Sequence, residues 1–130
     1  MKKNLVLVLV ALLCVCVFAL AKPKKTKVTG FLIDKACSGG VAKKDNPMEA
    51  AAGHTKKCAL MEKCVASGLG VFADGKFYEL DDNGKTMAKA FLEKSTLDKG
   101  VKVTVEGTAE EATPTTVMVK KLVAAKEAKK

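Results

Sequence analysis

The chain lacks arginine and tryptophan altogether, and its 130 residues include one tyrosine and one histidine, His54. All 23 basic residues are therefore lysines; with 14 acidic residues they give a net charge of +9. Arginine is the side chain that best recognises phosphate in a bidentate way, whereas lysine is a hydrated point charge. A basic protein without arginine is thus not expected to read nucleic acid. A lone histidine also limits any catalytic or metal centre to one imidazole.

Several sequence motifs of enzymes are missing as well. There is no Cys-x-x-Cys, which argues against a thioredoxin-like active site, and no Cys-x-x-Cys-His for haem attachment. The glycines mark turns and do not form a phosphate-binding loop. A cysteine hydrolase is disfavoured because His54 would lie four residues from Cys58 along one helix, a poor catalytic geometry. These absences favour a binding protein over an enzyme.

The N-terminus resembles a secretory leader. Lys2 and Lys3 precede an uncharged apolar run, and Ala19-Leu20-Ala21 fits a small-x-small cleavage site. The run is shorter than the ~20 apolar residues that a spanning helix needs. We therefore expect a signal peptide over residues 1–21 and a periplasmic or secreted protein with no membrane span after cleavage. Loss of the two leader lysines lowers the net charge from +9 to +7.

The remaining chain is long enough for one domain with a modest core. We expect that domain over residues 28–124, between a basic linker at 22–27 and a charged tail at 125–130. Alternating apolar residues and turn signals predict five strands and a helix. The Asp74-Gly75 pair predicts a tight hairpin turn. The strands are expected near residues 27–34, 69–73, 76–80, 101–108 and 116–123, and the helix over 85–95.

Residues 35–68 form an insertion between the first two strands. The sequence predicts a loop over 35–46, a helix capped by Asn46 with Pro47 at its first position, and a further helix capped by Thr55. Without the insertion, the order is β-β-β-α-β-β. This order resembles the OB-fold, and we expect an α+β domain with an OB-like five-stranded antiparallel barrel. An open antiparallel sheet with helices on one face is the alternative.

The sequence also resembles a group of small exported bacterial proteins. The likeness rests on the opening Gly30-Phe-Leu-Ile-Asp-Lys-Ala-Cys37, on His54-Thr-Lys-Lys-Cys-Ala-Leu-Met-x-x-Cys64, and on the hairpin Asp74-Gly-Lys-Phe-Tyr-Glu-Leu80. The barrel half is similar to exported bacterial OB-fold proteins. These resemblances imply an exported location and imply no activity.

The most informative segment is the one from His54 to Cys64. If residues 54–66 form one helix, His54, Cys58, Met61 and Cys64 lie within about a third of its circumference. Cys37 lies upstream, so three cysteines follow the leader. An exported protein favours disulfides, but an odd number cannot all pair within one chain. The third thiol allows a disulfide-linked dimer, a metal site or thiol chemistry.

One interpretation of the cluster is a disulfide staple. Cys58 and Cys64 would lie ~9 Å apart along an intact helix, beyond the ~7 Å Cα separation that a disulfide allows. Cys37 would therefore pair with Cys58 or with Cys64. Such a bridge would stabilise the fold by ~3 kcal/mol in the chain-entropy model, and the domain would bind an unidentified ligand or protein partner.

The second interpretation is a metal site. Cys37, His54, Cys58 and Cys64 make up a familiar zinc ligand set, whereas replacing one thiolate with the Met61 thioether favours monovalent copper. A third interpretation makes Cys58 a redox-active thiol, because the start of a helix and the neighbouring lysines lower a thiol pKa. The residues alone leave these three interpretations open.

Overall fold

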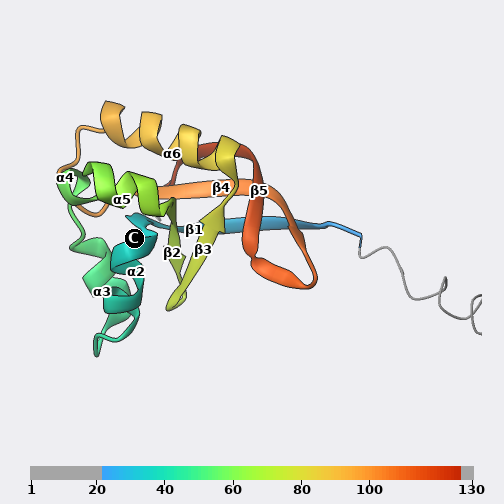
Figure 1. The fold of residues 1–130 in the computed structure, drawn as a ribbon, viewed down its shortest axis with the longest axis horizontal. Coiled ribbons are helices and arrows are strands. Elements are labelled where there is room, and N and C mark those ends of the chain that lie inside the picture. The colour runs from blue at the N-terminus through green and yellow to red at the C-terminus, as the bar shows by residue number, and fades with distance from the viewer. Residues whose placement is uncertain (1–21, 127–130) are drawn as a thin grey trace, which may run out of the picture.

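The computed structural model describes residues 22–126, so the predicted signal peptide and the last four residues lie outside the described chain. In this part of the chain, five strands form one sheet and five helices surround part of it (Figure 1). Within residues 22–126, no helix has the length and apolar character required to cross a membrane. The strands are β1 (Lys24–Asp34), β2 (Leu69–Ala73), β3 (Lys76–Leu80), β4 (Lys102–Glu110) and β5 (Thr113–Ala124). The helices are α2 (Lys35–Ala42), α3 (Pro47–Ala52), α4 (Lys56–Ala59), α5 (Glu62–Ser67) and α6 (Asp82–Lys94).

The five strands close into a ring in the order β1-β2-β3-β5-β4. Four neighbouring pairs are antiparallel, but β3 and β5 run parallel, with Leu80 opposite Val117. The prediction of an entirely antiparallel sheet was therefore wrong. The reason is parity, because directions cannot alternate around a closed ring that has an odd number of strands. The mixed α+β class and the five-stranded sheet agree with the prediction.

Strand β1 is long and pairs with two neighbouring strands. Its first part pairs with β4, from Lys24 opposite Ala109 onward, and its last part pairs with β2 up to Asp34 opposite Leu69. Residues 24–27, expected to be a linker, thus belong to the sheet. Where β1 passes from one neighbour to the other, Gly30 lies so close to the backbone carbonyl of Phe72 that a Cβ atom would clash. This close approach explains why a glycine occupies position 30.

The ring encloses the main core, which α6 covers (Figure 1). Among the apolar residues of the strands and of α6, Phe31, Phe77 and Phe91 are only partly buried, whereas the following are buried: Ile33, Val71, Val103, Val105, Val117 and Val119. The helix begins three residues earlier than predicted because Asp81 caps it. Asp81 Oδ1 accepts hydrogen bonds from the backbone N–H groups of Gly84 (2.9 Å) and Val119 (3.0 Å), which joins α6 to β5.

The insertion is more helical than expected. Residues 35–42 form α2 instead of a loop, even though Gly39 and Gly40 are poor helix formers. Two side chains explain its start: Asp34 caps the Cys37 N–H, and the Ser38 hydroxyl donates to Lys35 O (2.8 Å). The Asn46 and Thr55 caps are confirmed, because their side chains accept hydrogen bonds from the N–H groups of Glu49 and Cys58.

Residues 54–66 do not form one helix. Helix α4 ends at Ala59, Met61 has an extended conformation (φ −61°, ψ 141°), and α5 begins at Glu62. The break buries Ala59 and packs Leu60 against the core. An intact helix would hold Cys58 and Cys64 ~9 Å apart; the break removes that constraint and lets their side chains converge.

Candidate metal centre

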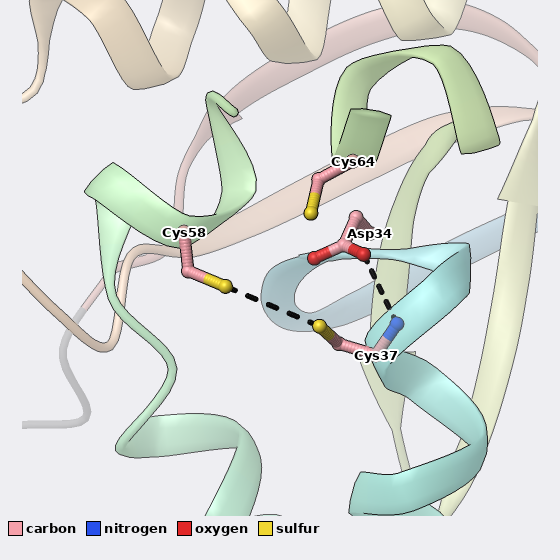
Figure 2. A group of neighbouring side chains, drawn as sticks. All are labelled: Asp34, Cys37, Cys58 and Cys64. Atoms are coloured by element: carbon pink, nitrogen blue, oxygen red, sulfur yellow. Dashed lines mark hydrogen bonds between the residues drawn. The ribbon is translucent and has the colours of Figure 1, made fainter. Parts of the chain in front are cut away.

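Asp34 is a buried carboxylate at the junction of sheet and insertion. It is the last residue of β1 and the N-cap of α2, and it is 0% exposed. Its Oδ1 accepts a hydrogen bond from the Cys37 N–H at 3.0 Å. The other oxygen, Oδ2, points toward the neighbouring thiols (Figure 2) and has no hydrogen-bond partner among the described residues. A buried carboxylate oxygen without a partner is costly unless something else interacts with it.

Three short helices each present one thiol to this carboxylate. Cys37 lies in the first turn of α2, Cys58 in α4, and Cys64 in α5. Cys64 is 2% exposed, whereas Cys37 and Cys58 are partly buried. In Figure 2 the three sulfurs and the Asp34 carboxylate point toward a common centre. The cluster thus has one deeply buried side and one side closer to solvent.

Backbone and side-chain hydrogen bonds fix these helices relative to the strand. The Ser67 hydroxyl accepts a hydrogen bond from Ala36 N–H (3.1 Å) and donates to Cys64 O (2.7 Å), which ties α5 to α2. At the other side, His54 O accepts the Gly100 N–H (3.2 Å) and Lys56 N–H donates to Asp98 O (2.8 Å). The four side chains are therefore held by connections outside the cluster itself.

The ligand atoms of Asp34, Cys37, Cys58 and Cys64 all lie within 4.8 Å of one another. They are close enough to hold a metal ion. The Sγ atoms of Cys37 and Cys58 lie 4.0 Å apart. Two thiolates bound to one tetrahedral zinc at ~2.3 Å each would be ~3.8 Å apart. The observed separation is thus near the value for two ligands of one ion.

The 4.0 Å separation of the Cys37 and Cys58 sulfurs also corrects the prediction of a disulfide. A disulfide bond requires sulfurs ~2.05 Å apart, and all three cysteines in the described chain are free thiols. The pairs Cys37–Cys58 and Cys37–Cys64 do not form a bond in this structure. The break between α4 and α5 gives the physical reason, because it brings a third thiol and a carboxylate to the place where a single pair was expected.

The electrostatics of the cluster oppose negative charge on two of its thiols, those of Cys37 and Cys64. Burial, together with the adjacent Asp34 carboxylate and the Cys58 thiol, raises the pKa of Cys37 to about 12. Burial and the Asp34 charge also raise the pKa of Cys64. This is the opposite of the low thiol pKa that a redox-active cysteine needs. Thiolates at Cys37 and Cys64 therefore require a compensating positive charge.

His54 lies against Asp34. Its Nε2 is 3.2 Å from Asp34 Oδ2, and the histidine side chain is 8% exposed. The two atoms are close but not aligned for a hydrogen bond, so that Nε2, Nδ1 and Oδ2 all lack hydrogen-bond partners in the described chain. His54 is not a member of the group of four that surrounds the common centre.

Sequence reasoning thus found three members of the group and missed the fourth. Cys37, Cys58 and Cys64 come together as expected, whereas Asp34 was placed only at the end of the first strand and was not considered as a ligand. Its signal was the position three residues before a cysteine, directly after the apolar run Phe31-Leu-Ile33. Met61 caps the start of α5 through its backbone and is 40% exposed, and its role as a ligand stays a prediction.

Comparisons with protein-family models, curated proteins and solved structures found no match to this chain.

Proposed function

We propose that the protein is an exported metal-binding protein and that Asp34, Cys37, Cys58 and Cys64 bind one zinc ion. The observation that carries this proposal is the convergence of four ligand atoms within 4.8 Å of one another. Three thiolates and one carboxylate are all accepted ligands of zinc. The two positive charges of the ion would offset part of the negative charge of the three thiolates and the carboxylate.

The ligand set favours zinc over copper. Monovalent copper prefers soft thiolate and thioether ligands, and the Asp34 oxygen is a hard ligand. The thioether of Met61, which a copper site would use, is 40% exposed. A fourfold protein ligand set leaves no open position for substrate, which is typical of structural zinc sites. The proposed role is therefore to bind zinc and hold the insertion together, without catalysis.

The proposal includes the wider fold and the location. Five strands in a closed order, with one helix between the third and fourth strands, support an OB-type barrel. The insertion lies between β1 and β2, at a loop that OB-folds commonly use for binding. The N-terminal sequence pattern supports export to the periplasm or beyond. The zinc-bound insertion would then form one part of a binding surface.

Native mass spectrometry of the protein, exported and purified without chelator, tests the proposal. We expect one zinc per chain after addition of Zn²⁺, and a loss of that adduct in Cys58→Ser and Cys64→Ser. Met61→Leu is the matched control, since it removes the sulfur that lies between Cys58 and Cys64 in the sequence and should keep the zinc. A chain that binds no zinc in any form overturns the proposal.

A thiol-redox function is the second candidate, supported by the 4.0 Å separation of Cys37 and Cys58. Exchange of this pair with a disulfide of a partner molecule would form the Cys37–Cys58 disulfide, reduce the partner disulfide to two thiols, and leave Cys64 as a thiol. The same mass measurement separates the candidates. A mass two hydrogens below the reduced chain, with no metal adduct, would favour the redox function, and reversible cycling with a dithiol reductant would be its signature.

A further inference from the structure

The contact between His54 and Asp34 extends the proposed zinc site beyond its four ligands. We infer that His54 is a positioning residue, which holds the Asp34 carboxylate in place as the oxygen ligand and so makes the site select Zn²⁺ over Cu⁺. This inference rests on the proposed zinc-binding function. It assigns the single histidine a role outside the ligand set that the sequence predicted for it.

The two oxygens of Asp34 have different surroundings. Oδ1 is committed to the N-cap of α2 through the Cys37 N–H. Oδ2 points into the cluster (Figure 2) and is fully buried without a hydrogen bond. A partial rotation of the carboxylate about its Cβ–Cγ bond would move Oδ1 away from the Cys37 N–H and Oδ2 away from the cluster. A donor at Oδ2 would therefore fix the oxygen that faces the ion.

His54 is the side chain in the right place to donate. Its Nε2 is 3.2 Å from Oδ2 and its ring is buried, so a modest rotation of the ring aligns an Nε2–H with the second lone pair of Oδ2. The backbone of His54 is held in place by the hydrogen bond from Gly100 N–H to His54 O. A carboxylate ligand hydrogen-bonded from outside is a common arrangement, and loss of such a partner typically lowers metal affinity 10- to 100-fold.

The hydrogen bond from His54 to Asp34 should affect the binding only of ions that coordinate the Asp34 oxygen. Zinc takes four ligands and needs the carboxylate to complete its tetrahedron, whereas Cu⁺ is satisfied by thiolates alone. Removal of the donor should therefore weaken zinc binding and leave copper binding nearly unchanged. A direct imidazole ligand predicts a different result, because a carboxamide in place of the histidine would not restore zinc binding.

Competition with chromophoric chelators for Zn²⁺ and for Cu⁺ tests the inference on the full chain. We expect His54→Leu to weaken zinc binding by about 10- to 100-fold and to change Cu⁺ binding by less than about threefold. His54→Gln retains an N–H donor and should bind zinc nearly as well as the original protein. Lys57→Gln, an exposed change beside Cys58, is the control for a substitution near the cluster that does not contact Asp34.

A double-mutant cycle separates the effect of His54 on the Asp34 carboxylate from a general loss of folding. In an Asp34→Asn background the anionic oxygen is absent, so that His54→Leu should cause no further loss of zinc affinity. The inference is overturned if His54→Leu binds zinc as tightly as the original protein, if it weakens both ions equally, or if His54→Gln is as poor as His54→Leu. If the original protein binds no zinc at all, the proposed function fails as well, which distinguishes the two failures.

Discussion

Asp34 contacts Cys37 in two ways: its Oδ1 accepts the Cys37 N–H at 3.0 Å, and its charge acts on the Cys37 thiol. The same carboxylate therefore starts a helix and faces the proposed ion. These two roles are separable, because asparagine is as good an N-cap as aspartate but lacks the anionic oxygen.

Asp34→Asn and Asp34→Ala should differ in stability and agree in zinc binding. With zinc removed, we expect Asp34→Ala to lower the free energy of unfolding by about 1 kcal/mol relative to Asp34→Asn, through loss of the cap. Both variants should lose most of the zinc affinity of the original protein. Urea unfolding in chelator and zinc competition measure the two effects. Full zinc affinity in Asp34→Asn would remove Asp34 from the ligand set.

The raised pKa of Cys37 predicts opposite pH dependences with and without zinc. In the metal-free fold this pKa rises from an ordinary value near 9.0 to about 12. The unfolded chain then loses the proton first, so that the contribution of Cys37 to stability is fully present below pH 9 and is lost as the pH rises toward 12. Zinc binding requires deprotonated thiols and should strengthen as the pH rises from 5 to 8.

Thermal unfolding over these pH ranges, with zinc or with chelator, checks this prediction. Other groups also affect stability at high pH, so the relevant quantity is the difference in melting temperature between the original protein and Cys37→Ser. In chelator, that difference should shrink as the pH rises from 9 to 12. A difference that is constant over this range would contradict the burial and charge effects assigned to Cys37.

The sequence predicts the sheet better than the insertion, for physical reasons. Strand alternation and the Asp74-Gly75 turn, whose residues have positive φ (50° and 75°), are local properties. The conformation of residues 54–66 is not local, because the break at Met61 depends on packing Ala59 and Leu60 against the core. Sequence periodicity favoured one helix, and that error hid the approach of Cys58 to Cys64.

The fourth member of the site was missed for a related reason. A pattern of cysteines and histidine is visible in one dimension, whereas the burial of Asp34 depends on β1, β2 and three helices meeting at the end of one strand. The sequence placed His54 in this region as a metal ligand, and His54 keeps that role only as a prediction. Its closest charged contact is a carboxylate 20 residues earlier, which helical spacing cannot predict.

Glu79 provides a pH-dependent link between the sheet and the insertion. Its carboxylate lies 2.9 Å from Lys35 Nζ, at the start of α2, and 3.6 Å from Lys85 Nζ in α6. The hydrogen bond from Lys35, assisted by the charges of both lysines, lowers the pKa of Glu79 from its ordinary 4.5. The contribution of Glu79 to stability is therefore present above pH 4.5 and is lost as the pH falls through its lowered folded pKa.

Glu79→Gln should show a smaller loss of stability on acidification than the original protein between pH 5 and pH 2. Urea unfolding at a series of pH values measures this difference. Because these side chains are partly exposed, salt should reduce the effect. Glu93→Gln, at an exposed ion pair with Lys89, is the control and should follow the original protein more closely. Identical acid profiles for Glu79→Gln and the original protein would contradict the link.

Substitution by alanine should have opposite effects on stability at Gly30 and at Gly40. A Cβ atom at Gly30 would clash with the backbone carbonyl of Phe72, where β1 passes between its two neighbours, whereas a Cβ at Gly40 in α2 meets nothing within 4 Å. Gly30→Ala should therefore lower the free energy of unfolding by about 1–3 kcal/mol. Gly40→Ala should raise it by up to about 1 kcal/mol, because alanine favours the helix.

Urea unfolding of both variants in chelator measures these changes without the influence of zinc. Zinc binding adds a second readout, because α2 carries Cys37 and β1 ends at Asp34. Gly40→Ala should keep zinc affinity at the original value or above it, since a more stable α2 holds Cys37 in place. If Gly30→Ala is as stable as the original protein, the close approach of β1 to Phe72 is wrong, and with it the path that β1 takes to deliver Asp34 to the three thiols.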